Sequence, residues 1–280
     1  MYEKGEIMNK RAHVNSLCSF YKKNRKGQVT IFIIIAIIIV AAGVLIYSFY
    51  PQIKSTLSNQ EVTPESYIQN CLEEEMLNAV DKLSVQGGTI TPENYILYDD
   101  TKVEYLCYTS EYYKPCVVQQ PMLKNHIERE IKNEIDEEIN ACFSSMKESY
   151  EKKGYAVDLK SGQKKIELLP KRIVATFNYS LTLTKGSDTK SHNSFSVVMN
   201  NNLYELTSIA SSIVESESEY GDAETTVYMM YYHDLKVEKD LQSSGEKIYI
   251  LTDRNTENKF QFASRAQAWP AGQVSPETWL

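Results

Sequence analysis

Residues 29–50, VTIFIIIAIIIVAAGVLIYSFY, decide how this chain is organised, and they contain no charged residue. As a helix, about 22 residues at 1.5 Å each extend roughly 33 Å, which is enough to cross the hydrocarbon core of a bilayer. A helix this long that is apolar on every face has no place on a soluble surface. The sequence therefore predicts a single transmembrane helix at residues 28–50.

Basic residues are concentrated ahead of this apolar stretch. Residues 1–27 contain seven lysines and arginines and two glutamates, which gives a net charge of +5. The net charge of the whole chain is −7, so the remaining residues carry −12. Because basic flanks stay on the cytoplasmic side, we expect a single-pass protein of the cell membrane with a cytoplasmic N-terminus and a large domain outside. An acidic outer domain argues against nucleic-acid binding, which needs a basic face.

The junction at Lys26 carries a second pattern. In the segment KGQVTIFIII, a lysine and Gly27 precede Gln28 and the apolar helix. This segment resembles the class III signal of archaeal type IV pilins and archaellins, in which a membrane peptidase cuts after the glycine and the apolar segment stays on the mature protein. The resemblance implies a processing site between Gly27 and Gln28. Pilins usually have glutamate at the fifth position after the cut, where this chain has Phe32, so we expect a membrane-resident or minor component and not the main subunit of a filament.

A broader resemblance extends over residues 26–40. This stretch is similar to the opening of a set of uncharacterised single-pass membrane proteins from small-genome archaea. Members of that set also carry a Cys-Leu helix that ends in Gly-Gly, similar to Cys71-Leu72 and Gly87-Gly88 here. The resemblance implies no activity.

The five cysteines are divided between the two predicted compartments. Cys18 lies in the basic arm, and Cys71, Cys107, Cys116 and Cys142 lie outside, where an even count favours disulfides over buried thiols. Cys71 and Cys142 each lie beside the apolar stripe of a predicted helix, so we expect them to pair, which leaves Cys107 for Cys116. In the chain-entropy model the wide loop contributes roughly 4.4 kcal/mol and the short loop roughly 2.7 kcal/mol. A metal site is disfavoured because no Cys-x-x-Cys spacing is present.

The remainder of the chain predicts an α+β domain at residues 64–267, after a linker at 51–63 and before a tail at 268–280. Amphipathic helices are predicted from residue 63 to about 83, from after Pro121 to about Tyr150, and over a short stretch from Asn202. Strands are predicted where apolar residues alternate with polar ones. They cover 95–98, 103–106, 173–184, 195–199, 227–232, 247–252 and 259–263, with a polar loop at 185–193 and an acidic linker at 215–224.

Catalytic signatures are missing from this pattern. His126, His192 and His233 form no recognisable set of metal ligands, and His233-Asp234 at the end of a predicted strand is more typical of a structural position than of acid–base catalysis. The sequence contains no nucleophile elbow, phosphate loop or dinucleotide fingerprint. We therefore predict no catalytic residue, no metal and no cofactor.

Two other features favour a surface role. Tyrosines cluster at Tyr105/Tyr108/Tyr112/Tyr113 and at Tyr228/Tyr231/Tyr232. Such clusters suit protein or glycan contact surfaces, and they suit half-buried strands equally well. Asn178-Tyr179-Ser180 is an acceptor triplet for N-glycosylation, with Asn178 on the polar face of its predicted strand.

Together these features predict a membrane-anchored, non-enzymatic cell-surface protein. Its partners would be the lipid bilayer and other envelope or pilin-like proteins, and its outer domain would make protein or glycan contacts. A ligand-binding or sensory ectodomain is the first alternative, although a cytoplasmic arm of 27 residues is a poor output. An unrecognised surface enzyme is the second, and it would need a cleft with convergent, perturbed titratable groups.

Overall fold

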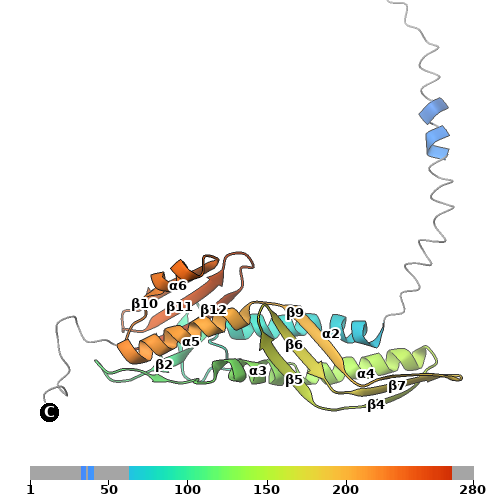
Figure 1. Ribbon diagram of the computed structural model, residues 1–280, viewed down its shortest axis with the longest axis horizontal. Helices are drawn as coiled ribbons and strands as arrows, with labels where there is room; N and C mark the ends of the chain where they lie inside the picture. Colours follow the sequence, from blue (N-terminus) through green and yellow to red (C-terminus); the bar gives the residue numbers. More distant parts are fainter. Residues whose placement is uncertain (1–32, 36, 41–62, 267–280) are drawn as a thin grey trace, which may run out of the picture. The chain divides into compact units, whose positions relative to one another are not determined.

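A computed structural model describes residues 33–35, 37–40 and 63–266 (Figure 1). The chain divides into two compact units, residues 1–61 and 62–280. In the first unit the described residues are helical and exposed. None of the helices formed by described residues combines the length and the apolarity that a membrane crossing needs. Most of the predicted span at 28–50, the processing site at Gly27-Gln28, Cys18 and the tail at 268–280 lie outside the described residues, so these expectations stay predictions.

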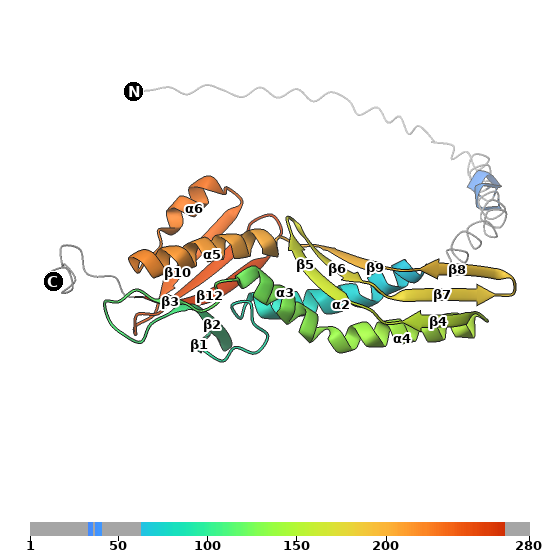
Figure 2. The ribbon, with the colours of Figure 1, turned by 60° about the horizontal axis from the view of Figure 1, so that its bottom comes forward.

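The second unit has the predicted α+β class, and we describe it as two regions. The helical region contains three helices and two antiparallel sheets of three strands, ordered β5-β6-β9 and β4-β7-β8 (Figure 2). Its elements are α2 (Pro64–Ser84), α3 (Leu123–Glu134), α4 (Asp136–Lys152), β4 (Ala156–Lys160), β5 (Lys164–Leu169), β6 (Arg172–Phe177), β7 (Ser180–Lys185), β8 (Asp188–His192) and β9 (Phe195–Asn200).

The mixed-sheet region contains one six-stranded sheet in the order β1-β2-β12-β11-β10, with β3 also paired to β2. Strands β12 and β2 are parallel, and the other pairs are antiparallel. Helix α5 crosses this sheet and α6 packs on β10 (Figure 1). The elements are β1 (Tyr95–Tyr98), β2 (Thr101–Tyr108), β3 (Val117–Val118), α5 (Leu203–Tyr220), α6 (Thr225–Tyr231), β10 (Leu235–Leu241), β11 (Lys247–Asp253) and β12 (Lys259–Arg265).

Helix α2 begins and ends where its sequence predicts. The Thr63 side chain accepts a hydrogen bond from the Ser66 backbone N–H at 3.2 Å, and Pro64 occupies the first turn. The helix ends before Gly87 and Gly88, whose φ angles of 83° and 91° lie in the left-handed region. A Cβ on Gly87 would meet the Cβ of Glu104 at 2.8 Å, so this turn also requires glycine for space.

The predicted helix from Pro121 to Tyr150 is two helices. Ile135 separates α3 from α4 with φ −97° and ψ 12°, and its side chain is buried within the same apolar stripe. The Lys164 ammonium lies 3.3 Å from the backbone oxygen of Asp136. The backbone ladder continues across the junction, because the Ile135 N–H donates to the Ile131 oxygen at 3.2 Å and the Ile139 N–H donates to the Ile135 oxygen at 2.9 Å, so the break is a local change in the Ile135 dihedral angles. The stripe predicted one continuous helix because the break leaves every apolar residue on the same face.

The predicted strand at 173–184 is also two strands, β6 and β7, which belong to different sheets. The chain breaks at Asn178, whose backbone N–H donates to the Gln163 oxygen at 2.9 Å. The connection between β4 and β5 crosses the chain at this point, and a Cβ on Gly162 would lie 1.9 Å from the Asn178 oxygen. Asn178 therefore lies in an exposed break and not on the polar face of a strand.

Three further predictions were wrong. The polar loop at 185–193 contains β8, which pairs with β7 and has no buried residue to produce an apolar period. The strand at 227–232 is α6, whose start is capped by the Glu224 carboxylate accepting from the Thr226 N–H at 3.0 Å. The acidic linker at 215–224 is mostly helical, because α5 continues to Tyr220 before Gly221 ends it at φ 75°. Strands β3, β4, β5 and β10 had no counterpart in the prediction.

The disulfides join the pairs that the sequence predicts. Cys71 on α2 bonds to Cys142 on α4, with their Cα atoms 6.1 Å apart, and Cys107 on β2 bonds to Cys116 with a Cα separation of 5.4 Å. Near the first bond the core is aromatic, since Phe143 packs edge-on against both Phe177 and Phe195.

Candidate functional site

Helix α5, helix α6 and the turn that joins them line an open groove with a volume of about 780 Å³, which we call the α6 groove. Its lining combines four tyrosines with hydroxyl and carboxylate side chains: Ser212, Ser216, Tyr220, Asp222, Glu224, Val227, Tyr228, Tyr231 and Tyr232. Helix α6 buries none of its own residues, and it is held mainly against β10. Tyr228 and Met229 pack against the core, so α6 forms a wall of the groove that touches the core through these partly buried side chains.

The tyrosines of the groove are mostly exposed. Tyr220, Tyr231 and Tyr232 have exposed fractions of 67%, 78% and 55%, and the neighbouring Met230 has 73%. The Tyr228 hydroxyl lies 3.1 Å from the Ser212 hydroxyl, which fixes its ring against α5. Amphipathic rings that bury apolar area at low entropic cost are typical of contact surfaces.

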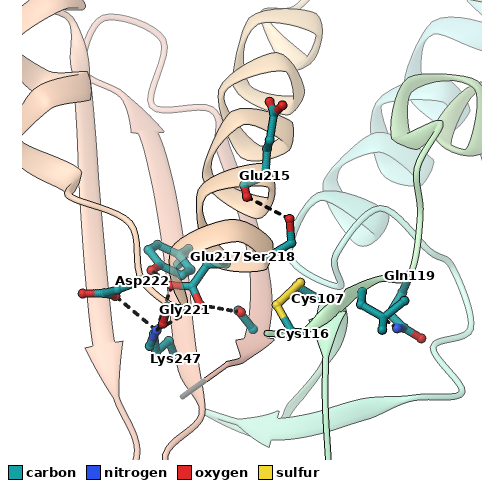
Figure 3. Close-up of a disulfide and its surroundings, with 12 residues drawn as sticks. Cys107, Cys116, Gln119, Glu215, Glu217, Ser218, Gly221, Asp222 and Lys247 are labelled. Atoms are coloured by element: carbon teal, nitrogen blue, oxygen red, sulfur yellow. Dashed lines mark hydrogen bonds and ion pairs between the residues drawn. A yellow bond between two sulfur atoms is a disulfide. The ribbon is translucent and has the colours of Figure 1, made fainter. Parts of the chain in front are cut away.

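Next to the groove, a carboxylate and an ammonium group are buried together (Figure 3). Glu217 projects from α5 toward the sheet and is fully buried. Both of its carboxylate oxygens lie 2.9 Å from the Lys247 Nζ on β11. It also accepts hydrogen bonds from the Tyr249 hydroxyl and, at 2.9 Å, from the Ser264 hydroxyl. We call this set of residues the Glu217 network.

The electrostatics of the Glu217 network follow from its burial. Burial raises the pKa of Glu217, although the Lys247 ammonium opposes this shift. Burial and the nearby Glu217 carboxylate raise the pKa of Tyr249 well above its ordinary value. A buried charge of this kind is costly unless it is paired and hydrogen-bonded, and here the carboxylate has three different donors.

Asp222 belongs to both the groove and the network. Its Oδ1 lies 3.1 Å from the Lys247 Nζ, and the Lys239 Nζ lies 3.0 Å and 3.1 Å from its two oxygens. Partial burial opposes ionisation of Asp222, but Lys239 and Lys247 outweigh it and lower the pKa of the carboxyl. A second cavity of about 330 Å³ adjoins these side chains.

A second buried carboxylate, that of Glu104, lies on β2, and none of the lysines and arginines that the structure describes is hydrogen-bonded to it. Glu104 accepts a hydrogen bond from the Thr89 hydroxyl, whose oxygen lies 2.8 Å from the His126 Nε2. Burial raises the pKa of Glu104 despite the Thr89 bond, and Glu130 and Glu93 add to the shift. Burial also lowers the pKa of His126.

The three histidines considered from the sequence as possible ligands are dispersed in the structure. His126 lies beside Thr89, and the His192 Nδ1 lies 2.5 Å from Glu65, whereas His233 is exposed at the end of α6. Within the described part of the chain, no three His, Cys, Asp or Glu side chains are grouped so that they could hold a metal ion.

The two tyrosine clusters differ in exposure. Tyr105 is buried, and its ring centroid lies 5.0 Å from that of Tyr108 in a tilted arrangement, while Tyr112 is exposed with the Arg265 guanidinium 5.5 Å from its ring. This cluster is partly structural, and burial raises the pKa of Tyr105 to about 12. The cluster at Tyr228, Tyr231 and Tyr232 lines the α6 groove.

The Glu217 network was missed in the sequence because Glu217 lies in the acidic run ESESE at 215–219. A weak indication of its burial is present in the sequence. Glu217 follows Ile213 by four residues, which places both on the same face of a helix. Nothing local to the sequence links it to Lys247, which lies 30 residues further on.

Comparison with known proteins gave no relative: no family model, no curated protein and no solved structure matches this chain.

Proposed function

We propose that this chain is a membrane-anchored cell-surface protein whose outer domain makes non-enzymatic contacts with another protein through the α6 groove. The anchor is the apolar segment at 28–50, and the basic arm ahead of it sets the orientation. The observation that carries the contact function is the exposure of Tyr220, Tyr231 and Tyr232 around one open groove.

A protein partner is favoured over a glycan by the apolar side chains around these rings. Met230 has an exposed fraction of 73%, and Val227 in the groove has 46%. Contact surfaces between proteins concentrate tyrosine and methionine at their centre and exclude charge there. The carboxylates of the groove are already engaged, since Asp222 pairs with lysines and Glu224 caps α6.

Photochemical cross-linking in intact cells tests this proposal. Tyr231 is replaced in the full-length protein by a photoreactive phenylalanine analogue, and the same analogue at Leu97 on β1 is the matched control, because Leu97 has an exposed fraction of 65%. We expect a protein adduct of one defined mass at position 231 and none at 97. The adduct should be lost when Tyr232→Ala and Met230→Ser are added. Adducts with carbohydrate alone would favour the glycan alternative, and no adduct at 231 would contradict a contact role for the groove.

Two measurements test the anchor and its processing. Protease added to intact cells should remove the domain after residue 50, and full protection until lysis would contradict the orientation. Mass spectrometry of the N-terminal peptide should find Gln28 as the first residue if the pilin-like signal is used. Finding this chain as the bulk protein of purified filaments would contradict the expectation of a minor component.

A further inference from the structure

We propose that Lys247 and Asp222 join through an intramolecular amide bond, with Glu217 as the proton carrier. The bond would form within the folded domain, without another enzyme, and would link the turn after α5 to β11. This inference is independent of the partner proposed for the α6 groove, because it concerns only groups that already touch one another.

The two reacting groups are in place. The Lys247 Nζ lies 3.1 Å from Asp222 Oδ1, the atom bonded to the carbon that the nitrogen would attack, so the two groups already touch in the folded protein. The Lys247 side chain has an exposed fraction of 9%, and its Nζ also donates to the Gly221 oxygen at 2.5 Å. A lysine fixed in this way has little rotational freedom left to lose when it reacts.

Glu217 is suited to carry protons for this reaction. Both of its oxygens lie 2.9 Å from the nitrogen that would react, and Tyr249 and Ser264 hold the carboxylate in that position. Burial raises its pKa, which helps it hold a proton taken from the ammonium group. Since it touches the reacting nitrogen, Glu217 would be a catalytic residue of the cross-link.

Lys239 would stabilise the charge that develops during the attack. Its Nζ lies 3.0 Å and 3.1 Å from the two oxygens of Asp222. When an amine adds to a carboxyl carbon, negative charge collects on the remaining oxygen, and a fixed ammonium group at this distance stabilises it.

The reaction balances without an oxidant, a reductant or a co-reactant. Glu217 passes one ammonium proton from Lys247 to Asp222, which leaves an amine and a carboxylic acid. The nitrogen lone pair attacks Cγ of Asp222, and a C–N bond forms. The C–O bond to the hydroxyl then breaks, and the hydroxyl leaves as water with a second proton from the nitrogen, carried by Glu217. Lys239 and Lys247 lower the pKa of Asp222, so the first transfer is uphill and the reaction is a slow, single event.

Such a bond would strengthen the wall of the α6 groove. Asp222 lines the groove, and Lys247 lies in a strand that pairs on both sides, with β10 and with β12. A load applied to α6 would then pass through a covalent bond into the sheet. An ordinary ion pair would give no such covalent connection. The protein with the amide bond is lighter than the protein with the ion pair by the mass of one water.

The decisive measurement uses the full-length protein from its own cells. We expect an intact mass lower by one water, beyond the loss accounted for by two disulfides, and a branched peptide that contains residues 222 and 247 after digestion. Recovery of the two residues in separate, unmodified peptides after prolonged incubation of the folded protein would overturn the proposal.

Variants assign the roles of the side chains. Lys247→Arg and Asp222→Ala should abolish the bond. Glu217→Gln should slow its formation by about 100-fold or more, in line with the loss of a proton carrier. Lys239→Gln should slow it by about 10-fold or more. Lys236→Gln is the matched control and should leave the rate of bond formation unchanged. Lys236 lies on β10, the strand of Lys239, but it is exposed and forms an ion pair with Glu238.

Folding of each variant is checked by mapping the two disulfides under non-reducing conditions. If Glu217→Gln fails to fold, Lys239→Gln still tests whether the charged groups around Asp222 promote bond formation. The Lys239 side chain is partly exposed and lies outside the core, so its replacement should leave the fold intact. A branched peptide that forms at the wild-type rate in folded Glu217→Gln would overturn the role of Glu217.

Discussion

The helical region and the mixed-sheet region use different means to stabilise one folded unit. Between residues 123 and 200 every buried side chain among the described residues is apolar or aromatic, and Ser84 at the end of α2 is the one buried polar residue of the helical region. The mixed-sheet region and its adjoining turns contain the other buried polar and charged residues. They are Thr89, Glu104, Asn201, Asn202, Thr207, Glu217, Glu246, Lys247 and Ser264.

This difference indicates where the chemistry of the protein lies. The side chains of an apolar core need no hydrogen-bond or ion-pair partner, and the disulfide between Cys71 and Cys142 adds a covalent constraint. The helical region therefore serves as a scaffold. Buried charges cost stability unless each is paired, and so they are retained where they serve a structural or functional purpose. The α6 groove, the Glu217 network and the exposed tyrosines all belong to the mixed-sheet region.

The largest effect should come from the scaffold disulfide. Replacing Cys71→Ala and Cys142→Ala together opens a loop with a sequence separation of 71. The chain-entropy model gives a loss of roughly 4.4 kcal/mol in the free energy of unfolding. Denaturant unfolding followed by fluorescence measures it, with the wild-type protein under reducing conditions for comparison. A loss no greater than that for the short disulfide would contradict the view that this bond is the main constraint of the helical region.

The next largest effect should come from the buried charge. Glu217→Ala removes the carboxylate that pairs with Lys247 and leaves that ammonium group buried, and the comparison uses freshly made wild-type protein in which intact mass shows that the Lys247–Asp222 amide has not yet formed. Breaking a buried pair from one side costs about 3–5 kcal/mol, and here we expect about 3 kcal/mol because Asp222 and the Gly221 oxygen still contact Lys247. The double variant Glu217→Leu with Lys247→Met is the control, since it removes both charges and should recover most of the loss. An unchanged midpoint in Glu217→Ala would show that the pair contributes nothing.

The short disulfide should have a smaller effect. Cys107→Ala with Cys116→Ala opens a loop with a sequence separation of 9, for which the model gives a loss of roughly 2.7 kcal/mol. The loss should be local, because β3 pairs with β2 through only two residues, Val117 and Val118. Hydrogen exchange should therefore rise at β3 and stay unchanged at α2. Equal increases in both places would mean that the two regions unfold together.

The sequence predicted the parts of both regions that follow a regular period. The stripe of Ile68, Leu72, Met76 and Val80 determined α2, and it placed Cys71 next to the apolar face, from which the pairing with Cys142 followed. Strands β11 and β12 were predicted as a hairpin of residues 247–252 and 259–263 around the turn at Arg254-Asn255-Thr256. Such patterns are local, so the sequence contains all the information they need.

What could not be predicted depends on contacts between distant residues. The break at Asn178 arises from the crossing at Gly162, and the period of two continues through it undisturbed. Strand β8 is exposed along its length and gives no apolar alternation. Glu217 lies in an acidic run that is typical of a linker, and its position is explained by its contacts with Lys247, Tyr249 and Ser264 on other strands.

The smallest effect should come from Glu104, and its sign should depend on pH. Burial raises the pKa of Glu104 above its ordinary value of 4.5, so the folded state favours the protonated form. The stability that this proton provides is complete below pH 4.5 and is lost as the pH rises through the raised pKa of the folded protein. Above that pH the folded protein holds a buried carboxylate whose hydrogen-bond partner is the hydroxyl of Thr89.

Glu104→Gln keeps an oxygen that can accept from Thr89 and removes the charge. It should therefore raise the free energy of unfolding at pH 8 by on the order of 1 kcal/mol, and the difference from wild type should vanish near pH 4. His126, whose pKa is lowered by burial, is present in both proteins, so its own pH dependence cancels in this difference. Glu75→Gln on the exposed face of α2 is the matched control and should show no such trend. A variant that is less stable than wild type at pH 8 would mean that Glu104 is stabilised as a carboxylate, and the contrast with the lysine-paired Glu217 would then disappear.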